Sequence, residues 1–401
     1  MKKHVLVIGG GATGVGIARD LSLRNFNVTL VEKENLGGGT SGKSHGLLHS
    51  GARYAESDYN GAKECIEENE VLKDIAGNCI RDTGGLFLQL EGDDNDYYNR
   101  KLSACKDIGI SVNEFTKTEL LDKYPQLTEN LVKGFEVPDA VIYPSRLTAL
   151  NAESAVKNGA EIYTQTEVTN IKVENNEIIS VSVTGDLETT MYPDYVVNAG
   201  GPWAGKIADL ADINVGMAPS KGVMVAMDES NIKPVLNRCR DPDDGDIVIP
   251  HENQVVIGTT SVPVSDPDKY NKENEEVELC IDECSDMLPS INDLKIERTW
   301  WGVRPLYSPD EDGKNRRGIS RGFHLIDHDN VTNMVSVVGG KLTTYRKMAE
   351  ETTDYICEYY GIDKDCVTAE KELPYNKDDS KIDEIVNKYG GYNPTDHNIS
   401  K

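Results

Sequence analysis

The sequence predicts an α/β protein in which a nucleotide-binding sheet is interwoven with a second, mostly antiparallel sheet. Three observations carry this prediction. A complete strand, glycine turn, helix and strand pattern opens the chain, a strand that runs into glycines recurs at 194–205, and alternating apolar segments follow at 222–227, 246–250 and 254–260. We therefore expect one discontinuous α/β domain with a second domain woven through it.

The first βαβ unit predicts a dinucleotide site. Residues 4–8 (HVLVI) are a short apolar run, as in a strand buried on both faces of a parallel sheet. The turn Gly9-Gly10-Gly11-Ala12-Thr13-Gly14 follows, then a helix with Val15, Ala18 and Leu21 on one face, then the strand VTLVE ending on Glu32. Glycines let the backbone approach a pyrophosphate, the helix N-terminus faces its charge, and Glu32 can accept hydrogen bonds from a ribose. The motif alone does not separate FAD from NAD.

The segment after this unit suggests how far the ligand extends. Residues 37–56 read GGGTSGKSHGLLHSGARYAE, which is too rich in Gly, Ser and Thr for a core element. A flexible linker is the alternative for its first half. Small hydroxyl residues directly after the ribose-binding strand suit a ligand that continues past its adenosine, as FAD does.

The remaining elements follow from periodicity. Residues 59–76 suggest an amphipathic helix, and 161–185 two strands joined at the turn Asn175-Asn176. Helices are expected near 65–130 and 273–288, and the polar residues 371–401 are expected to be peripheral.

Composition excludes several classes of function. The chain has 401 residues, 38% of them hydrophobic, and contains no run of the roughly 20 apolar residues that span a bilayer. The start MKKHVLVIGG enters a strand instead of a signal peptide, which predicts a cytoplasmic protein. A net charge of -26 argues against nucleic-acid or anionic-membrane binding through bulk electrostatics, so an anionic ligand needs local cations. The acidity fits either a saline cytoplasm or simple solubility.

The eight cysteines predict neither a metal site nor a disulfide framework. They show no CxxC pattern and no paired histidine. Cys280 and Cys284 lie four residues apart in a predicted helix and could share a metal, but no second ligand pair is near them in sequence. We interpret all eight as structural thiols: Cys65, Cys79, Cys105, Cys239, Cys280, Cys284, Cys357 and Cys366.

Residues 336–351 (SVVGGKLTTYRKMAEE) predict a second anion-facing turn. An apolar strand breaks at Gly339 and Gly340, Lys341 stands at the break, and a helix is expected to begin at Thr343. Such a turn presents backbone N–H groups and one ammonium to a negative group. An ordinary capped helix, with Met348, Thr352, Tyr355 and Tyr359 as its buried face, is compatible with this interpretation.

Together these motifs resemble those of the FAD-dependent glycerol-3-phosphate dehydrogenases. The resemblance rests on VIGGGATGVG, GGGTSGKSHGLLHSGARYAE, VVNAGGPWAG, VIGTTS, WWGVRPL and SVVGGKLTTYRKMAE, in order, between about residues 3 and 370. The stretch KGVMVAMDESNIKPVLNRCRDPDDGDIVIP is closer to the A-subunit of the anaerobic enzyme than to the single-chain aerobic form.

The resemblance implies a glutathione-reductase-like, Rossmann-type FAD domain of the D-amino-acid-oxidase type with an interwoven antiparallel-sheet substrate domain. The expected domains are 1–85, 145–215 and 315–370 for FAD, 86–144 and 216–314 for substrate, and 371–401 as a polar tail. It implies oxidation of sn-glycerol 3-phosphate to dihydroxyacetone phosphate. Electrons would pass through electron-transfer or membrane-anchor subunits to a quinone, with the chain peripheral at the inner face of the cell membrane. Nothing after residue 370 supplies the cysteines of the iron–sulphur-type domain with which the A-subunit usually continues.

The family also implies site residues. For FAD these are Gly9, Gly11, Ala12, Thr13, Gly14, Glu32, Lys33, Thr40, Ser41, Ser44, His45, Gly46, Leu48, Val168, Ala199, Gly200, Trp203, Gly340, Lys341, Leu342 and Thr343. For substrate they are Arg53, Tyr54, Arg304 and Lys341, three of them cations suited to a phosphate dianion. Each cation has the alternative of a solvated surface charge.

The catalytic candidates are Arg304, Lys341, Arg53 and His49. The aerobic branch has a histidine where this chain has Met224, so that role cannot be carried over. His49 and His251 remain as candidates for the general base, with His49 preferred for its glycine-rich loop, and each has a structural role as its alternative. Two other functions stay open. One is an FAD-dependent amino-acid or 2-hydroxy-acid oxidoreductase whose arginine binds a carboxylate, and the other is a non-catalytic electron-relay flavoprotein.

Overall fold

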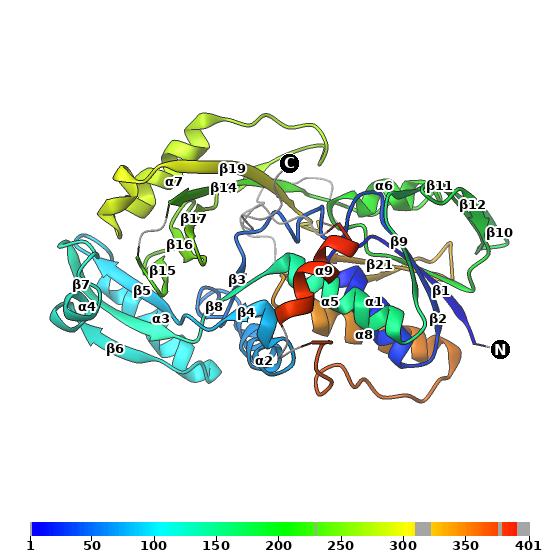
Figure 1. Ribbon diagram of the computed structural model, residues 1–401, viewed down its shortest axis with the longest axis horizontal. Helices are drawn as coiled ribbons and strands as arrows, with labels where there is room; N and C mark the ends of the chain where they lie inside the picture. Colours follow the sequence, from blue (N-terminus) through cyan, green and yellow to red (C-terminus); the bar gives the residue numbers. More distant parts are fainter. Residues whose placement is uncertain (1, 229–230, 309–321, 376–378, 391–401) are drawn as a thin grey trace.

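The computed structural model describes residues 2–228, 231–308, 322–375 and 379–390. Two large sheets organise the molecule, at opposite ends of Figure 1. The first has six strands in the order β20-β21-β13-β1-β2-β9, and the second has nine strands. The elements of the first sheet are β1 (His4–Ile8), β2 (Asn27–Val31), β9 (Glu161–Tyr163), β13 (Tyr195–Asn198), β20 (Phe323–Asp327) and β21 (Met334–Gly339).

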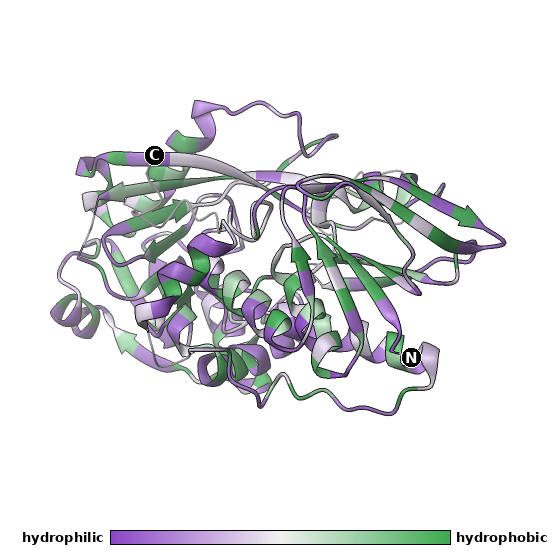
Figure 2. Ribbon diagram, turned by 45° about the vertical axis from the view of Figure 1, so that its right-hand side comes forward, coloured by the Kyte–Doolittle hydropathy of each residue, from purple (hydrophilic) through white to green (hydrophobic). Residues whose placement is uncertain are grey.

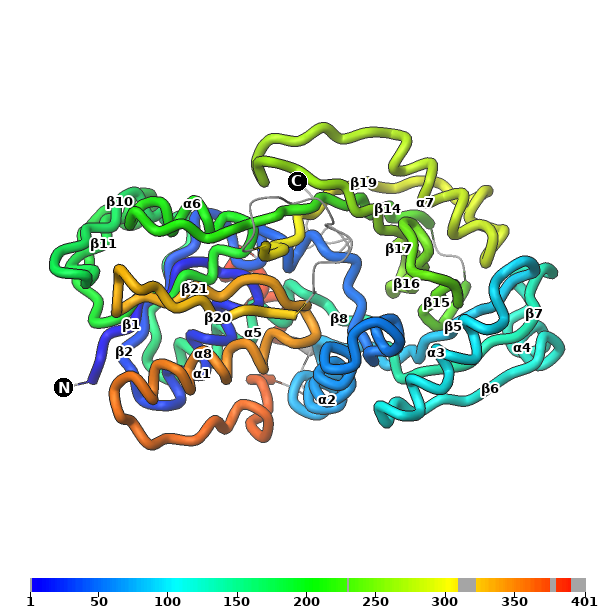
Figure 3. The backbone as a smooth tube through the Cα atoms, turned by 180° about the vertical axis from the view of Figure 1, so that it is seen from behind, coloured from blue at the N-terminus to red at the C-terminus, as the bar shows by residue number. Residues whose placement is uncertain are grey.

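The six-stranded sheet confirms the nucleotide-binding pattern at the start of the chain. β1 pairs in parallel with both β2 and β13, and β21 pairs in parallel with β13. Strands from the two ends of the sequence therefore lie in one sheet, as Figure 3 shows from behind. The expected discontinuity of this sheet follows from its strand order, because β13 and β21 return to it after long excursions.

Each face of this sheet has its own cover. Val5 and Val7 of β1 face the helices α1 (Ala12–Leu23), α5 (Pro144–Lys157) and α8 (Tyr345–Tyr360). Leu6 and Ile8 face α6 (Ala204–Asp209) and a three-stranded sheet of β10 (Thr166–Glu174), β11 (Glu177–Gly185) and β12 (Thr189–Met191). The strands are consequently apolar on both sides, which is visible as their green colour in Figure 2.

The predicted hairpin at Asn175-Asn176 is confirmed. β10 and β11 pair antiparallel, and both asparagines at the turn have positive φ, 52° and 64°. Asparagine tolerates this left-handed conformation, which a two-residue turn of this type requires at both central positions.

The second sheet is mostly antiparallel, as expected. Its path is β18-β14-β17-β16-β15-β5-β7-β6, and β19 pairs with β14. The pair β5 and β15 is parallel. The strands are β5 (Gly85–Leu90), β6 (Asn113–Thr116), β7 (Leu131–Val137), β14 (Ser220–Asp228), β15 (Val235–Arg238), β16 (Ile247–Pro250), β17 (Gln254–Gly258), β18 (Val262–Pro263) and β19 (Ile296–Arg304).

Helices α3 (Asn95–Ile108), α4 (Lys117–Lys123) and α7 (Asn274–Ser285) lie with the second sheet at the left of Figure 1. α2 (Tyr59–Ile75) fits the amphipathic helix predicted at 59–76. A small sheet of β3 (Leu47–Leu48), β8 (Ala140–Ile142) and β4 (Ile80–Arg81) lies between the two large ones. None of the helices in the described part of the chain is both long enough and apolar enough to cross a membrane.

The expectation that residues 371–401 are peripheral is wrong for part of that segment. α9 (Ile382–Lys388) lies against α5, and Leu373, Ile382, Ile385 and Tyr389 are buried in the core beside α1 and α5. The segment is polar on average because only one face of a short helix carries its apolar residues. Residues 391–401, and the domain boundary expected at 314–315, lie outside the described residues.

Candidate active site

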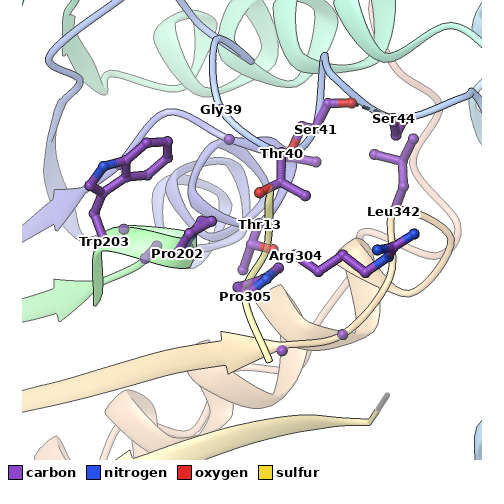
Figure 4. Close-up of a pocket in the computed structure, with 18 of the residues that line it drawn as sticks. Thr13, Gly39, Thr40, Ser41, Ser44, Pro202, Trp203, Arg304, Pro305 and Leu342 are labelled. Carbon is purple, nitrogen blue, oxygen red and sulfur yellow. Dashed lines mark hydrogen bonds between the residues drawn. The ribbon is translucent and has the colours of Figure 1, made fainter. Parts of the chain in front are cut away.

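A cavity of about 480 Å³ runs between the two large sheets. Gly9, Glu32 and Trp203 line it from the six-stranded sheet and its connections, and Thr259 and Arg304 line it from the second sheet. Figure 4 shows side chains from both sides pointing into this space, with Trp203 at one end and Leu342 at the other. Because the walls come from both sheets, a molecule that fills the cavity contacts both.

The glycine turn after β1 forms one wall. A Cβ on Gly9 would lie 2.5 Å from the carbonyl oxygen of Ala199, and a Cβ on Gly14 would lie 1.9 Å from that of Gly9. No side chain fits in either position, so both glycines are needed for the turn to close against β13 and α1. Ser41 adds a contact that the sequence did not reveal, since its Oγ accepts a hydrogen bond of 3.0 Å from the N–H of Ala12.

Glu32 follows β2 directly, and backbone groups fix its carboxylate. Its Oε2 accepts from the N–H of Gly10 at 2.6 Å, and its Oε1 accepts from the N–H of Glu34 at 2.8 Å. Burial raises the pKa of Glu32, although these two hydrogen bonds act in the opposite direction. The carboxylate is thereby held at the cavity wall in one orientation, as a ribose-binding acid requires.

Most predicted cofactor residues share this cavity. Those that line it are Gly9, Gly11, Ala12, Thr13, Glu32, Lys33, Thr40, Ser41, Ser44, His45, Val168, Ala199, Gly200, Trp203, Gly340, Lys341 and Leu342. The four others do not line it: Gly14, Gly46, Leu48 and Thr343. Thr343, for example, is fully buried and its Oγ1 accepts a hydrogen bond of 3.0 Å from the N–H of His49.

The segment at 40–43 is fastened to the strand that carries Arg304. Thr40 Oγ1 donates to the carbonyl of Val303 at 2.5 Å, and Trp300 Nε1 donates to the carbonyl of Lys43 at 3.1 Å. These bonds join the cofactor segment to β19 directly before Arg304. The position of Arg304 relative to the glycine turn is therefore set by hydrogen bonds as well as by strand pairing.

The three predicted cations line the cavity, but their surroundings differ. Arg304 Nη2 donates to Thr259 Oγ1 at 3.3 Å. Lys341 Nζ lies 4.6 Å from the centre of the Tyr54 ring, a cation–π contact. Arg53 forms an ion pair of 2.6 Å with buried Asp246 and also donates to the carbonyl of Asp243. Burial alone would lower the pKa of Arg53, but the carboxylate of Asp246 outweighs it and raises the pKa.

Lys341 is carried by a turn that is anchored from the next helix. α8 begins at Tyr345, two residues later than expected, and Arg346 in its first turn binds Glu68 of α2 at 2.5 and 2.9 Å. Both partners are buried. The predicted buried face of α8 is confirmed at Met348 and Thr352 and is wrong at Tyr359, which is 43% exposed.

The two candidate general bases, His49 and His251, lie in different surroundings. His49 lines the cavity, with its ring centre 5.3 Å from that of Tyr54 and 6.2 Å from that of His45. His251 lies outside that lining among the described residues, and its Nε2–H donates to the carbonyl of His45 at 3.0 Å. Burial lowers the pKa of His251 to about 4. Met224 is buried against Ala226, Val256 and Trp300.

Several lining residues escaped the sequence analysis. Thr259 and Ser261 follow β17 and stand beside Arg304, while Asp243 and Asp244 approach from the connection between β15 and β16. Lys206 and Asp268 stand near Trp203. The GTTS turn was a visible signal for the first pair. Asp243, Asp244 and Asp268 lie in polar loops without a motif and Lys206 lies in α6, so their approach to the cavity depends on tertiary structure.

A parallel sheet with a glycine-cradled cavity at the carboxyl ends of its strands defines a dinucleotide-binding protein. Comparison with known proteins narrows this class. Residues 4–346 match the family model described as FAD dependent oxidoreductase. The A1-subunit of the anaerobic glycerol-3-phosphate dehydrogenase of Haloferax volcanii is 46% identical, over 98% of this chain and 70% of its own length.

The A-subunit of the Escherichia coli K12 anaerobic glycerol-3-phosphate dehydrogenase is 40% identical, over 94% of this chain and 71% of its own length. Among solved structures, the glycerol-3-phosphate dehydrogenase of Bacillus halodurans complexed with FAD superimposes with a TM-score of 0.72 at 25% identity. That alignment covers 93% of this chain and 68% of the other. The chain belongs to the glycerol-3-phosphate dehydrogenase family of FAD-dependent oxidoreductases.

FAD is the cofactor, and the cavity fits it. The tight turn that Gly9 and Gly14 permit places Gly11, Ala12 and Thr13, at the start of α1, on the cavity lining, where a helix N-terminus suits a pyrophosphate. Glu32 is oriented for a ribose, and the wall continues through Ser41 and Ser44 to Lys341. The polar wall thus extends well beyond the ribose-binding acid, as the length of FAD requires.

Proposed function

We propose that this protein oxidises sn-glycerol 3-phosphate to dihydroxyacetone phosphate at the end of the cavity marked by Arg304 and Lys341. The observation that carries the proposal is that three cations, Arg53, Arg304 and Lys341, line the same cavity as the glycine turn and His49. A phosphate dianion can engage several positive groups, whereas a carboxylate needs only one guanidinium.

The cations have different tasks in this proposal. Arg304 binds the phosphate through its guanidinium, and Thr259 holds that side chain from the side. Lys341 adds a second positive charge at the turn before α8. Arg53 shares its charge with Asp246, so we assign it to the edge of the phosphate site and to the orientation of Tyr54.

His49 is the general base of the proposed reaction. It accepts the proton of the C2 hydroxyl, while bound FAD supplies the acceptor for the hydride from C2. The backbone of His49 is fixed by its hydrogen bond to Thr343, and Tyr54 packs against its ring. A base held in this way at the wall is already oriented when substrate arrives.

The turn at 340–344 serves both cofactor and substrate. Gly340, Lys341 and Leu342 line the cavity, and α8 starts directly after them. We propose that the positive end of α8 stabilises negative charge that develops on the flavin ring when it is reduced. Electrons then leave through partner subunits to a membrane quinone, with this chain at the inner face of the membrane.

The experiment that tests this function is an anaerobic titration of the yellow protein with glycerol 3-phosphate, lactate and glycine. The proposal predicts loss of the visible absorbance band of the oxidised flavin with glycerol 3-phosphate alone. Bleaching by lactate or glycine instead would indicate the carboxylate-oxidising alternative. A flavin that stays oxidised with all three would indicate a non-catalytic relay flavoprotein.

A further inference from the structure

The connection between β18 and α7 reaches from the second sheet to the cofactor-binding half of the molecule. In Figure 1 it is the long loop at the top that precedes α7 and extends toward α6. Two of its carboxylates, on Asp266 and Asp268, each lie 2.7 Å from Nζ of Lys206 in α6. The ammonium group of Lys206 therefore joins this loop to α6, although β18, which precedes the loop, belongs to the second sheet.

Asp268 also holds Trp203. Its Oδ1 accepts a hydrogen bond of 2.7 Å from Nε1 of the indole, and the same oxygen lies 3.8 Å from Nζ of Lys33. That ammonium stands 4.2 Å from the centre of the indole ring. Trp203 is thus oriented by one anion at its nitrogen and one cation at its face.

The turn that presents these carboxylates is itself ordered. Asp266 Oδ1 accepts from the N–H of Asp268 at 2.9 Å, and Lys269 N–H donates to the carbonyl of Asp266. Lys206 and the indole of Trp203 hold the pKa of Asp268 below its ordinary value, although burial opposes them. The carboxylate is consequently ionised throughout the neutral range, as both of its contacts require.

The cluster of Lys33, Lys206 and Asp268 around Trp203 lies at the cavity. Trp203, Lys33, Lys206 and Asp268 line the same cavity as Glu32. A Cβ on Gly39 would lie 3.2 Å from Cζ3 of Trp203, so the indole packs closely on the segment that follows the ribose-binding acid. The indole therefore lies beside Lys33, the residue that directly follows Glu32 on the cavity wall.

We propose that Asp266 and Asp268 form a clasp, with Lys206, that holds Trp203 over the nucleotide end of the FAD site and slows the release of FAD. Asp268 is a positioning residue in this arrangement, since it acts through the indole. The proposal rests on FAD as the cofactor and is independent of the substrate.

The ion pair between Lys206 and Asp268 in the clasp is partly exposed to solvent. The side chains of Lys206 and Asp268 are 48% and 44% exposed. An exposed ion pair contributes little on its own and is screened by salt, but here one carboxylate serves an ammonium and an indole together. Loss of Asp268 should therefore act on Trp203 more than on the stability of the folded chain.

The test measures FAD release from the purified holoenzyme without substrate, as free FAD in the filtrate at successive times after dilution. We expect Asp268→Ala to release FAD roughly tenfold faster than wild type, because it loses a charge-assisted hydrogen bond. Asp268→Asn keeps an acceptor for the indole and should release FAD only about threefold faster. Sodium chloride at about 1 M should narrow the difference between wild type and Asp268→Asn, since the Debye length falls to ~3 Å.

The control is Glu114→Ala, which removes a comparable exposed ion pair with Lys106 far along the second sheet. It should leave FAD release unchanged. The thermal midpoints of the apoproteins should agree among all variants, which separates the clasp from a general loss of stability. If Asp268→Ala does not fold, Trp203→Phe provides the second variant, because it keeps a ring and removes the Nε1 donor. Equal release rates for wild type and these variants would overturn the proposal.

Discussion

At the scale of single residues, Arg304 is the side chain on which the proposed substrate specificity depends. Arg304→Met should weaken binding of glycerol 3-phosphate by roughly 10- to 100-fold, because a charged hydrogen bond to phosphate is worth about 1.5–3 kcal/mol. The dissociation constant follows from the substrate dependence of flavin reduction in rapid mixing. Lys341→Met should act in the same direction.

The matched control is Arg298→Met. Arg298 lies on β19 like Arg304, but its guanidinium stands beside Trp300, away from the cavity lining. Removing it changes the charge of the chain by the same amount. Equal effects of the two substitutions on substrate binding would mean that Arg304 acts only through the net charge of the protein.

His49 should affect the rate of reduction more than binding. For His49→Asn we expect flavin reduction at saturating glycerol 3-phosphate to slow by about 100-fold or more, as when a general base is removed. The limiting rate in single-turnover measurements reports this step directly. A variant with a normal limiting rate and a weakened dissociation constant would assign His49 to substrate binding instead.

His251 should contribute to the pH dependence of stability. Its pKa is about 4 in the folded protein and about 6.5 in the unfolded chain. Below pH 6.5 the unfolded chain gains a proton that the folded protein does not, so stability is full above pH 6.5 and falls toward pH 4. The loss amounts to ~3 kcal/mol.

The comparison is with His251→Gln, whose amide can still donate to the carbonyl of His45. Urea unfolding at several pH values between 6.5 and 4.5 should give a flatter dependence for this variant than for wild type. The carboxylates titrate in both proteins and cancel in the difference. Identical slopes would show that His251 is solvated or protonated in the folded state.

Some of the site residues could be predicted from the sequence, and others could not. The glycine spacing identified Gly9, Gly14 and Glu32 because a pyrophosphate tolerates few alternatives. It could not reveal that Asp246 neutralises Arg53, since these residues are far apart in sequence and meet only in the folded protein. The distinction between His49 and His251 likewise depends on burial.

At the scale of elements, α9 is the clearest difference from expectation. Ile385→Ala should lower the free energy of unfolding by about 2–4 kcal/mol, because Ile385 is 6% exposed in the core with α1 and α5. Val367→Ala, at a site that is 41% exposed, should change it by less than about 0.5 kcal/mol. Denaturant unfolding of the apoproteins measures both.

A small effect of Ile385→Ala would mean that α9 is detached in solution.

The expectation that residues 371–401 are peripheral was wrong for a physical reason. Seven residues with three apolar positions give too weak a periodic signal to compete with a strongly polar surrounding sequence. By contrast, β1 was predictable from its short apolar run, and α1 from the glycine turn before it and its apolar face.

At the scale of the whole molecule, the cavity exists because two sheets of different kinds meet. The parallel sheet was predictable from the βαβ unit and the recurring strand at 194–205. The antiparallel sheet was predictable as a class, but not the parallel pairing of β5 with β15, which joins residues 85–90 to 235–238. Sequence patterns report which face of a strand is buried and do not report its partner.

The division of the chain into domains is likewise only partly predictable from the sequence. Most strands of the expected cofactor and substrate segments lie in separate large sheets, but β8, from the expected substrate segment 86–144, pairs with β3 and β4 of the expected cofactor segment. The domain boundaries stay predictions. Thr40, Lys43 and Asp268 tie the two halves together through hydrogen bonds to Val303, Trp300 and Trp203. The two halves are therefore expected to hold cofactor and substrate in a fixed relation, as hydride transfer requires.

In the proposed function, Arg304 and Lys341 bind a phosphate beside the flavin. The most direct measurement is a crystal structure of the FAD-loaded protein with dihydroxyacetone phosphate. We predict that phosphate oxygens lie within hydrogen-bonding distance of both side chains and that C2 lies between the flavin ring and His49. A phosphate bound elsewhere, with Arg304 and Lys341 turned away from it, would contradict the account.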